Sequence, residues 1–430
     1  MRILIFSELF YPHGGGAELA TWLYSKLLAE KGFEITIVTK HFPGEPLIES
    51  VSSGIRIYRL PMKMTFGSRY DTLVNVGVLL SNFMNRLFSE NDIVYIPASW
   101  YSAIPMAKIH KKPVVVHLHN YSIACPTSLM YDFTKQKVGS SSLKSFILHE
   151  AIERRRGIAS VVASSLMNEL LGRYYNKWGT LADALIFVSN AQANLVLSKV
   201  PQIKEKSRVI YNPIPNIPYI EAESRGLGYF GGKSFVKGFY TLMRALNSLI
   251  ERNVKVYMTM MSRKRVTVKV GNGILVDFLP KVNLRSIMQK LSVVVIPSLC
   301  PEPSPYILIE SMMYGKLVVA SNVGGIPEIV APINSGVKLV KPGECGEISE
   351  ALNSFLTLEL EEANEIGIRL RKHILRKFDK DETIKYFINN LDRINRKLSL
   401  VFNISLFCNN FLSYICTVLR LSDSQHCALK

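Results

Sequence analysis

Short apolar runs alternate with amphipathic stretches along most of the chain. The first run, Ile3–Phe6, leads through three glycines at positions 14–16 into a stretch from Glu18 to Lys31 whose leucines recur at helical spacing. The next apolar run is Ile35–Thr39. A strand, a glycine turn, a helix and a second strand form a parallel βαβ unit, and fully apolar strands are typical of a sheet buried on both faces. The pattern therefore predicts an α/β fold.

The alternation continues in two blocks separated by a proline-rich stretch. Further strands of the first block are predicted at Ile55–Leu60, Ile93–Ile96, Val114–Leu118 and Leu185–Val188. Asn212–Pro218 carries three prolines, which exclude a helix or a central strand there. Strands of the second block are predicted at Leu227–Phe230, Lys255–Met260, Ile274–Val276, Val293–Ile296, Leu317–Ala320 and Val337–Val340. A length of 430 residues also favours more than one domain.

We divide the chain into residues 1–206, residues 207–380, a closing helix at 381–397 and an extension at 398–430. Leu398–Leu419 has no charged residue and is about long enough to cross a bilayer, for which roughly 20 apolar residues are needed. Three asparagines interrupt it, and such groups are costly at membrane depth. A packed extension, a segment lying on a membrane and a spanning helix all stay open.

Composition narrows the classes of partner. The fractions of 48% hydrophobic and 20% charged residues are those of a folded globular protein, and the net charge of +18 favours an anionic partner. Basic residues are not interleaved with aromatic ones on one face, so we expect no nucleic acid. The six cysteines form no C-x-x-C pair, which argues against a metal site and a disulfide framework. The first apolar run is too short for a secretory signal, so we expect a cytoplasmic protein.

The segment Pro301–Gly315 holds the most specific chemical pattern. Glu302 and Glu310 lie on either side of a strand-to-helix turn, where the strand is Val293–Ile296 and the helix begins near Pro305. Ligands of open α/β sheets bind at such carboxyl ends, and the free N–H groups of a helix N-terminus suit a diphosphate. The two carboxylates could then hold hydroxyls of a sugar and a ribose. The alternative is two solvated glutamates.

Glu302 and Glu310 resemble the E-x7-E motif of retaining glycosyltransferases of the GT-B fold, family 4 (glycosyl transferases group 1). Other segments resemble that family in order from about residue 1 to residue 396. They are Pro12–Glu18, His117–Tyr121, Ala182–Ser189, Asn212–Ile214, Tyr229–Gly238 and the "GGxPE" loop Val323–Val330. The resemblance implies two Rossmann-like, doubly wound parallel-sheet domains facing a cleft. It places the acceptor in the N-terminal domain and the donor in the C-terminal one.

The resemblance also implies roles for individual residues. Lys237 would meet the donor diphosphate, Glu310 the ribose and Glu302 the donor sugar, with His119 nearby. The catalytic candidates are Glu302, His119 and Lys237. The donor-binding candidates are Gly15, Gly16, Gly231, Gly232, Lys233, Lys237, Ile307, Leu308 and Glu310. No metal ligand and no nucleophile are assigned.

Two positions depart from the family pattern. Gly232 stands where an arginine usually follows the first glycine, so Lys233 or the cluster Arg263–Arg265 would have to replace that phosphate contact. Ser304-Pro305 stands where many relatives have Phe-Gly. The proline leaves the helix start intact but removes one N–H donor.

Rival functions are less well supported. A dinucleotide-dependent dehydrogenase would need a third glycine after Gly14–Gly16 and an acid at the end of the second strand, where Thr39, Lys40 and His41 stand instead. Nothing marks the cofactor lysine of a phosphorylase. A non-catalytic sugar-nucleotide-binding scaffold stays open, although Glu302, Lys237 and Glu310 are all present.

The expected partners are a nucleoside-diphosphate sugar, with no obligatory metal or other cofactor, and an acceptor that is a glycan, a lipid-linked sugar or a small molecule. The donor base stays open among UDP, GDP and ADP. Positive charge and the apolar extension favour a lipid-linked acceptor and peripheral contact with the anionic inner face of the cell membrane. Such an activity belongs to polysaccharide or glycolipid biosynthesis.

Overall fold

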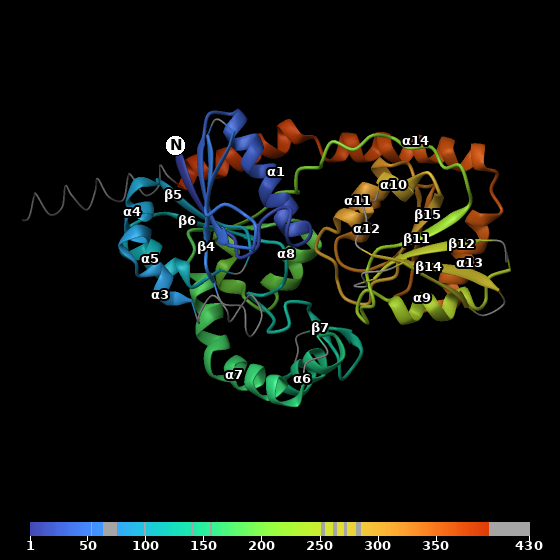
Figure 1. The fold of residues 1–430 in the computed structure, drawn as a ribbon, viewed down its shortest axis with the longest axis horizontal. Helices are drawn as coiled ribbons and strands as arrows, with labels where there is room; N and C mark the ends of the chain where they lie inside the picture. Colours follow the sequence, from blue (N-terminus) through green and yellow to red (C-terminus); the bar gives the residue numbers. More distant parts are fainter. Residues whose placement is uncertain are drawn as a thin grey trace, which may run out of the picture.

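The computed structural model contains two separate parallel sheets, each flanked by helices (Figure 1). It describes residues 1–394 apart from 53, 63–74, 99, 140–141, 155–156, 251–253, 261–264, 271–272 and 281–284. The predicted extension 398–430, the last residues of the predicted closing helix, and Arg263 and Lys264 lie outside the described residues.

The N-terminal sheet has the strand order β10-β9-β6-β5-β1-β2-β4-β3. Its strands are β1 (Arg2–Phe6), β2 (Glu34–Lys40), β3 (Ile48–Ser52), β4 (Ile55–Leu60), β5 (Ile93–Ile96), β6 (Val114–Leu118), β9 (Ala184–Phe187) and β10 (Ser207–Val209). All neighbours are parallel except β3, which runs antiparallel to β4 at the edge. From β4 to β9 the order is that of a doubly wound sheet, with its switch point between β1 and β5.

Burial on both faces explains why the strands are apolar throughout. Successive side chains of a strand point to opposite faces. In β1, Leu4 and Phe6 enter one core cluster, whereas Ile3 and Ile5 enter another on the opposite face. Both faces are therefore covered, as predicted for a parallel sheet.

Helices and one small hairpin connect these strands. The helices are α1 (Gly16–Glu30), α3 (Val76–Leu79), α4 (Asn82–Glu90), α5 (Ala103–Ile109), α6 (Leu143–Ile152), α7 (Ile158–Thr180), α8 (Asn190–Leu197) and the 3-10 helix Pro201–Lys206. The hairpin pairs β7 (Tyr131–Asp132) with β8 (Lys137–Val138). Together with α6 and α7 it forms an arm that projects from the N-terminal domain towards the C-terminal one (Figure 1).

The C-terminal sheet has the order β13-β14-β12-β11-β15-β16-β17. Its strands are β11 (Gly226–Tyr229), β12 (Lys255–Thr259), β13 (Val266–Val270), β14 (Ile274–Leu279), β15 (Leu291–Ile296), β16 (Leu317–Ser321) and β17 (Val337–Val340). The helices are α9 (Phe239–Leu246), α10 (Arg285–Met288), α11 (Tyr306–Met313), α12 (Ile326–Val330), α13 (Cys345–Leu356) and α14 (Leu360–Lys377). From β14 to β17 the doubly wound order recurs, with its switch point between β11 and β15.

Most predicted strands are confirmed within two or three residues at their ends, and the fold class is confirmed. Three edge strands, β3, β10 and β13, were missed; β3 and β13 run antiparallel to their neighbours, and β13 is mostly exposed and carries Lys269. The predicted division at residue 206 also precedes the end of the first sheet, because Ser207–Val209 pairs with β9.

A helix at 380–394 carries the chain back to the N-terminal domain (Figure 1). Ile384, Phe387, Leu391 and Ile394 belong to the core cluster that contains Ile3 and Ile5. The ring of Phe387 lies 4.5 Å from that of Tyr24 in α1. The end of the described chain thus completes the core of the first domain rather than the second.

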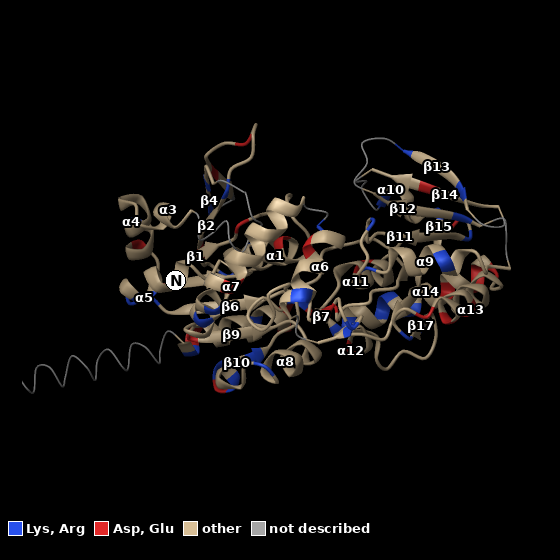
Figure 2. Ribbon diagram, turned by 90° about the horizontal axis from the view of Figure 1, so that it is seen from below, with Lys and Arg blue, Asp and Glu red and all other residues tan. Residues whose placement is uncertain are grey.

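Basic and acidic residues are distributed over both domains (Figure 2). No helix within the described ranges combines the length and apolarity that crossing a bilayer requires.

Candidate active site

Most of the predicted donor residues lie around the switch point of the C-terminal sheet. The loop with Gly231, Gly232 and Lys237 follows β11, and Glu302 lies in the loop that follows β15. Because β11 and β15 are neighbours whose connections leave in opposite directions, their carboxyl ends open a crevice between the two loops. Lys237 and Glu302 meet there.

Lys237 and Glu302 form an ion pair. Lys237 Nζ is 2.6 Å from Oε1 of Glu302, and Ser298 Oγ donates to the same oxygen at 2.8 Å. The Glu302 side chain is 9% exposed and that of Lys237 41%. Burial disfavours the charged amine, but the adjacent carboxylate outweighs burial and raises the pKa of Lys237. Lys237 is therefore a fixed cation, held at the crevice by a carboxylate that is itself anchored.

The "GGxPE" loop holds the backbone of Glu302 in place. Gly324 has a φ of +56°, and a Cβ there would lie 2.3 Å from the carbonyl oxygen of Glu302. A Cβ on Gly325 would lie 2.2 Å from the carbonyl oxygen of Pro303. The N–H of Gly325 donates to the Glu302 carbonyl at 2.8 Å. Only glycines allow this contact, which explains the spacing of the loop.

Tyr229 fixes the loop that follows β11. Its hydroxyl donates to the carbonyl oxygens of Gly232 at 3.0 Å and of Lys237 at 3.3 Å. A Cβ on Gly231 would lie 2.4 Å from that hydroxyl, whereas Gly232 has open space around it and Lys233 is exposed. Gly231 therefore packs inward, and Gly232 and Lys233 lie on the accessible side of the loop.

The structure places Arg265 away from this loop. Arg265 precedes the edge strand β13 and forms an ion pair with the buried Asp277, which also pairs with Lys255 at 3.2 Å. Burial opposes ionisation of Asp277, but its hydrogen bonds and these cations lower its pKa. In the described part of the Arg263–Arg265 cluster, the guanidinium of Arg265 is committed to the sheet edge and not to the loop of Gly232.

Helix α11 begins beside the crevice. Pro305 occupies its N-cap and supplies no side-chain hydrogen bond, so the N–H groups of Tyr306 and Ile307 are not capped by a side chain of the N-cap residue. Ile307 is half-buried against the core. Leu308 is fully buried in that core, and its N–H donates to Pro305 at 3.1 Å. Leu308 therefore supports the helix from behind and presents no side-chain atom to the crevice.

Glu310 lies one turn into α11. Its carboxylate forms no hydrogen bond or ion pair with any described residue, and burial raises its pKa to about 7. Glu302 thus has a cation and a hydroxyl as partners, whereas the carboxylate of Glu310 has no hydrogen-bond donor among the described residues. Ribose hydroxyls are donors of the kind that such a group accepts.

His119 lies one residue beyond β6. Asn212 Nδ2 is 3.5 Å from its Nδ1, and the buried Nε2 has no partner among the described residues. Burial lowers the pKa of His119 to about 3. The imidazole is therefore neutral, and the contact with Asn212 leaves Nε2 to carry the proton.

Tyr121 is a site residue that the sequence interpretation missed. It is 1% exposed, and its hydroxyl has no hydrogen-bond partner in the described part of the chain. Burial raises the pKa of Tyr121, and the nearby thiol of Cys300 and carboxylate of Glu302 add to the effect. Tyr121 therefore lies near Glu302, on the side of the N-terminal domain. Its motif was recognised, but only tertiary structure shows the unpartnered hydroxyl.

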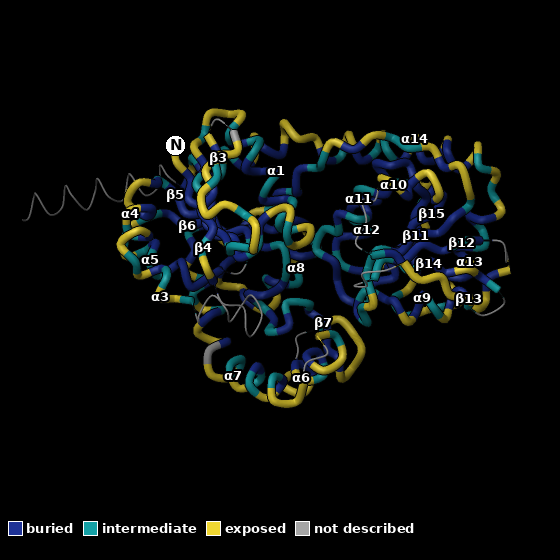
Figure 3. The backbone as a smooth tube through the Cα atoms, viewed as in Figure 1, coloured by how far each residue is buried: buried dark blue, intermediate teal, exposed yellow. Residues whose placement is uncertain are grey.

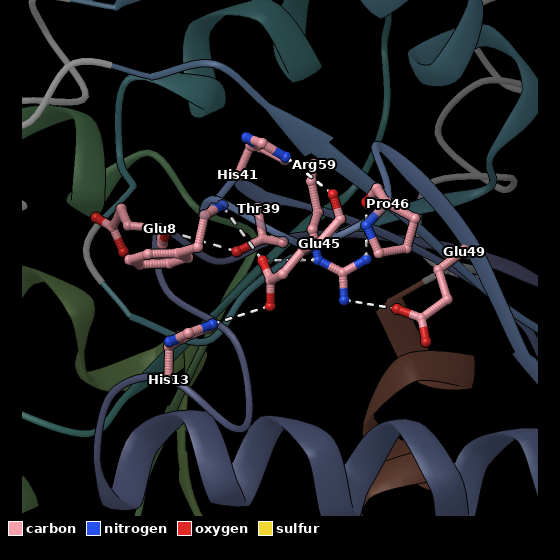
Figure 4. A network of polar contacts seen from close by, with 9 residues as sticks. Glu8, His13, Thr39, His41, Glu45, Pro46, Glu49 and Arg59 are labelled. Atoms are coloured by element: carbon pink, nitrogen blue, oxygen red, sulfur yellow. Dashed lines mark hydrogen bonds and ion pairs between the residues drawn. The ribbon is translucent and has the colours of Figure 1, made fainter.

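The glycine loop after β1 is anchored by a polar network (Figure 4). His13 Nε2 lies 2.9 Å from Glu45, whose carboxylate pairs with Arg59 at 3.2 Å; Arg59 also binds Glu49 at 2.6 Å. Burial opposes ionisation of Glu45, but His13 and Arg59 together lower its pKa. This network fixes the residue directly before Gly14.

Gly15 and Gly16 lie where the two domains meet. The N–H of Gly15 donates to Glu18 at 2.7 Å, which caps α1. A Cβ on Gly16 would lie 3.1 Å from the ring of Tyr306, the first residue of α11. The structure therefore brings the N-terminal glycine loop to the start of the helix that the sequence assigned to the donor.

Two carboxylates bridge the domains. Glu328 of α12 accepts hydrogen bonds from the N–H groups of Asn190 at 3.0 Å and Ala191 at 3.1 Å, the first turn of α8, and from the Tyr211 hydroxyl at 2.5 Å. Burial opposes ionisation, but these donors lower the pKa of Glu328. Glu328 belongs to the quoted "GGxPE" loop, yet no sequence signal identified its partner.

Glu153, directly after α6, makes the second bridge. It accepts hydrogen bonds from Ser234 Oγ and from the Phe235 N–H, the latter at 3.0 Å. Phe235 and Val236 also pack against Tyr131 and Phe133 of the N-terminal arm. The loop that carries Lys237 is therefore held from the opposite domain.

Among the described residues, no three His, Cys, Asp or Glu side chains are grouped so that they could hold a metal ion.

Two family profiles match the chain in succession. The family described as "Glycosyltransferase Family 4" matches residues 14–216, and "Glycosyl transferases group 1" matches residues 224–357. A curated relative, "Uncharacterized 42.6 kDa protein in cps region" of Klebsiella pneumoniae, is 23% identical over 345 residues, which cover 76% of this chain and 87% of the relative.

Solved structures share the whole architecture. Sucrose-phosphate synthase from Thermosynechococcus elongatus has a TM-score of 0.65 at 17% identity and covers 93% of this chain and 99% of its own. HepE from Anabaena, solved with UDP and glucose, has a TM-score of 0.63 at 17% identity, with 91% and 99% covered. At these identities the likeness shows the fold alone.

Proposed function

Because the chain is a glycosyltransferase of the GT-B fold, we propose that it moves a hexosyl group from a nucleoside-diphosphate sugar to an acceptor, with retention of anomeric configuration. The observation that carries this proposal is the Lys237–Glu302 pair at the switch point, beside the open N-terminus of α11. A cation and free N–H groups in one crevice suit a diphosphate.

Lys237 and the first turn of α11 would stabilise the negative charge that develops on the departing diphosphate. Lys233 would add a second cation from the accessible side of its loop. Glu310 would hold the ribose hydroxyls through its unpartnered carboxylate. Glu302 keeps one oxygen for Lys237 and Ser298, which leaves the other carboxylate oxygen for a sugar hydroxyl.

The N-terminal domain would supply the other side of the sugar site. A neutral His119 can donate one hydrogen bond from Nε2 but is too weak a base to remove a proton near neutral pH. As the acceptor oxygen bonds to the anomeric carbon, the bond to the phosphate oxygen breaks and its electron pair leaves with the diphosphate. We assign the acceptor's proton to that departing phosphate.

UDP is the first candidate for the donor nucleotide, since HepE was solved with it and shares the fold. We propose that the reaction needs no obligatory metal, because Lys237 and the α11 N-terminus supply positive charge. We place the protein in the cytoplasm, at the inner face of the membrane, with a lipid-linked acceptor as the first choice. A glycan acceptor is the second.

The test is a thermal-shift series with UDP, GDP, ADP and NAD on the full chain, followed by turnover of the matching nucleotide sugar with and without EDTA. A ligand at about 100-fold excess over Kd adds roughly 2.7 kcal/mol to the stability of the native state. We expect one nucleoside diphosphate to raise Tm in wild type and much less in Glu310→Gln. A shift with NAD alone, or with no nucleotide, would contradict the proposal.

A further inference from the structure

Helix α7 carries large apolar side chains on the side that faces solvent. Ile158, Val162, Leu166, Leu170 and Tyr174 are each 58% to 85% exposed. They recur every four residues, so the row winds slowly around the helix. The buried positions Val161 and Tyr175 lie on the opposite side. We call the five exposed residues the α7 apolar face.

Helix α6 extends this surface. Leu143, Ile147 and Ile152 of α6 are also exposed, and α6 packs beside α7. Both helices lie at one margin of the molecule, on the arm that projects from the N-terminal domain (Figures 1 and 3). Exposed apolar residues are ordinary when scattered, but a row that recurs every four residues along α7 marks an interaction surface.

The charges around this surface are mostly positive. Lys144 on α6, Arg154 just after it, and Arg173 and Lys177 on α7 are exposed. Within the described residues of 142–180, Glu169 is the one exposed acid; Glu150 is buried, and Glu153 is engaged with the C-terminal domain. Leucines and isoleucines flanked by Lys and Arg match an anionic lipid surface, where the chains enter the interface and the cations meet headgroups.

We propose that the α7 apolar face, with the adjoining face of α6, docks this glycosyltransferase on an anionic membrane. This inference deepens the proposed function, because it rests on transfer to a lipid-linked acceptor and names the surface that meets the lipid. Glu153 directly follows α6 and holds the loop of Lys237. The docking surface is therefore connected directly to the donor site.

The test is flotation of the full chain with vesicles of phosphatidylcholine containing phosphatidylglycerol, compared with phosphatidylcholine alone. We expect Leu166→Gln with Leu170→Gln to weaken vesicle binding by roughly tenfold or more, since each residue loses buried apolar surface. The matched control is Ile368→Gln with Leu375→Gln, two exposed positions of α14 in the other domain, which should bind like wild type.

Substitution of the charged residues tests the proposal independently. Arg173→Gln with Lys177→Gln should weaken binding roughly fivefold per residue on phosphatidylglycerol vesicles, and added salt should reduce that difference. Folding of every variant is checked by its Tm. Because the extension 398–430 is identical in all variants, binding through it would leave the α7 variants unchanged and would overturn the proposal.

Other outcomes also decide the matter. If wild type does not float, or if light scattering shows a dimer that Leu166→Gln with Leu170→Gln abolishes while flotation persists, the surface does not serve lipid binding. Flotation without any nucleotide binding would refute the proposed function but keep the docking surface. Nucleotide-dependent turnover without flotation would support the proposed function and refute the docking surface.

Discussion

The two sides of the crevice are built differently. On the C-terminal side, Glu302 has Lys237 and Ser298 as partners and is seated on Gly324 and Gly325. On the N-terminal side, His119 Nε2 and the Tyr121 hydroxyl are buried and have no partner among the described residues. Buried polar atoms are normally satisfied, and those that are not call for an explanation. Glu302 is thus organised in advance, whereas we infer that His119 and Tyr121, like Glu310 on the C-terminal side, obtain their hydrogen-bond partners from a ligand.

The largest expected effect comes from breaking the organised side. Lys237→Ala removes the cation of the crevice and leaves Glu302 buried without a counter-charge. We expect kcat to fall by about 10³-fold, the usual loss for one electrostatic contact to a developing charge. Lys233→Ala serves as the matched control and should lose less. Steady-state kinetics with the nucleotide sugar measure both, and a larger loss in the Lys233 variant would reverse the roles.

Glu310→Gln separates the two carboxylates of the C-terminal side. The pKa of Glu310 is raised to about 7 in the folded protein from an ordinary 4.5, so its stabilising contribution is complete below pH 4.5 and is lost as pH rises to 7. Relative to wild type, the ligand-free variant should therefore gain stability between these pH values, on the order of 2 kcal/mol. Urea unfolding at pH 5 and pH 8 measures it; an equal difference at both pH values would show that burial does not act on this group.

Glu328→Gln tests the bridge beside the site. The variant loses a charge at the N-terminus of α8 and weakens four hydrogen bonds, so we expect a loss of about 1–2 kcal/mol at pH 7. Because the folded pKa is lowered, the wild-type advantage should be present above pH 4.5 and vanish as pH falls through the folded value. Glu344→Gln, an exposed i,i+3 pair with Lys341, is the control and should change stability little.

Tyr121→Phe should have the smallest effect on stability. Its hydroxyl is buried without a described partner, so its removal should change the free energy of unfolding by less than about 0.5 kcal/mol. Sugar transfer should nevertheless fall about tenfold if that hydroxyl contacts the ligand. Tyr101→Phe is the contrast, because its hydroxyl lies 2.9 Å from Ser122 Oγ and its loss should cost about 1 kcal/mol. If the Tyr121 variant is the less stable of the two, the Tyr121 hydroxyl stabilises the ligand-free protein and does not depend on a ligand for its partner.

The local sequence pattern was enough to locate most strands and the two carboxylates, Glu302 in the loop before α11 and Glu310 within α11. Apolar runs such as Val114–Leu118 are unambiguous because both faces of the sheet are covered. Edge strands carry no such signal, since β3 and β13 are exposed and mixed in polarity. The difference between Glu302 and Glu310 was also hidden, because the partner of Glu302 lies 65 positions away. Long-range partners, not residue type, decide which carboxylate is paired.

The partners of the two bridging carboxylates could not be predicted from the sequence for the same reason. Glu328 reaches Asn190 across 138 positions, and Glu153 reaches Ser234 across 81. Glu153 stands in no distinctive pattern, and the "GGxPE" motif that contains Glu328 did not indicate its partner.

The return of the chain at 380–394 to the core of the first domain has a mechanical consequence. The backbone crosses between the domains twice, once through the proline-rich segment after β10 and once between α14 and that helix. A body held at two crossings can swing about the line that joins them but resists twisting about other axes. Any opening of the crevice would thereby be restricted mainly to rotation about that line, and a single proteolytic cut at either crossing would leave the halves tethered by the other.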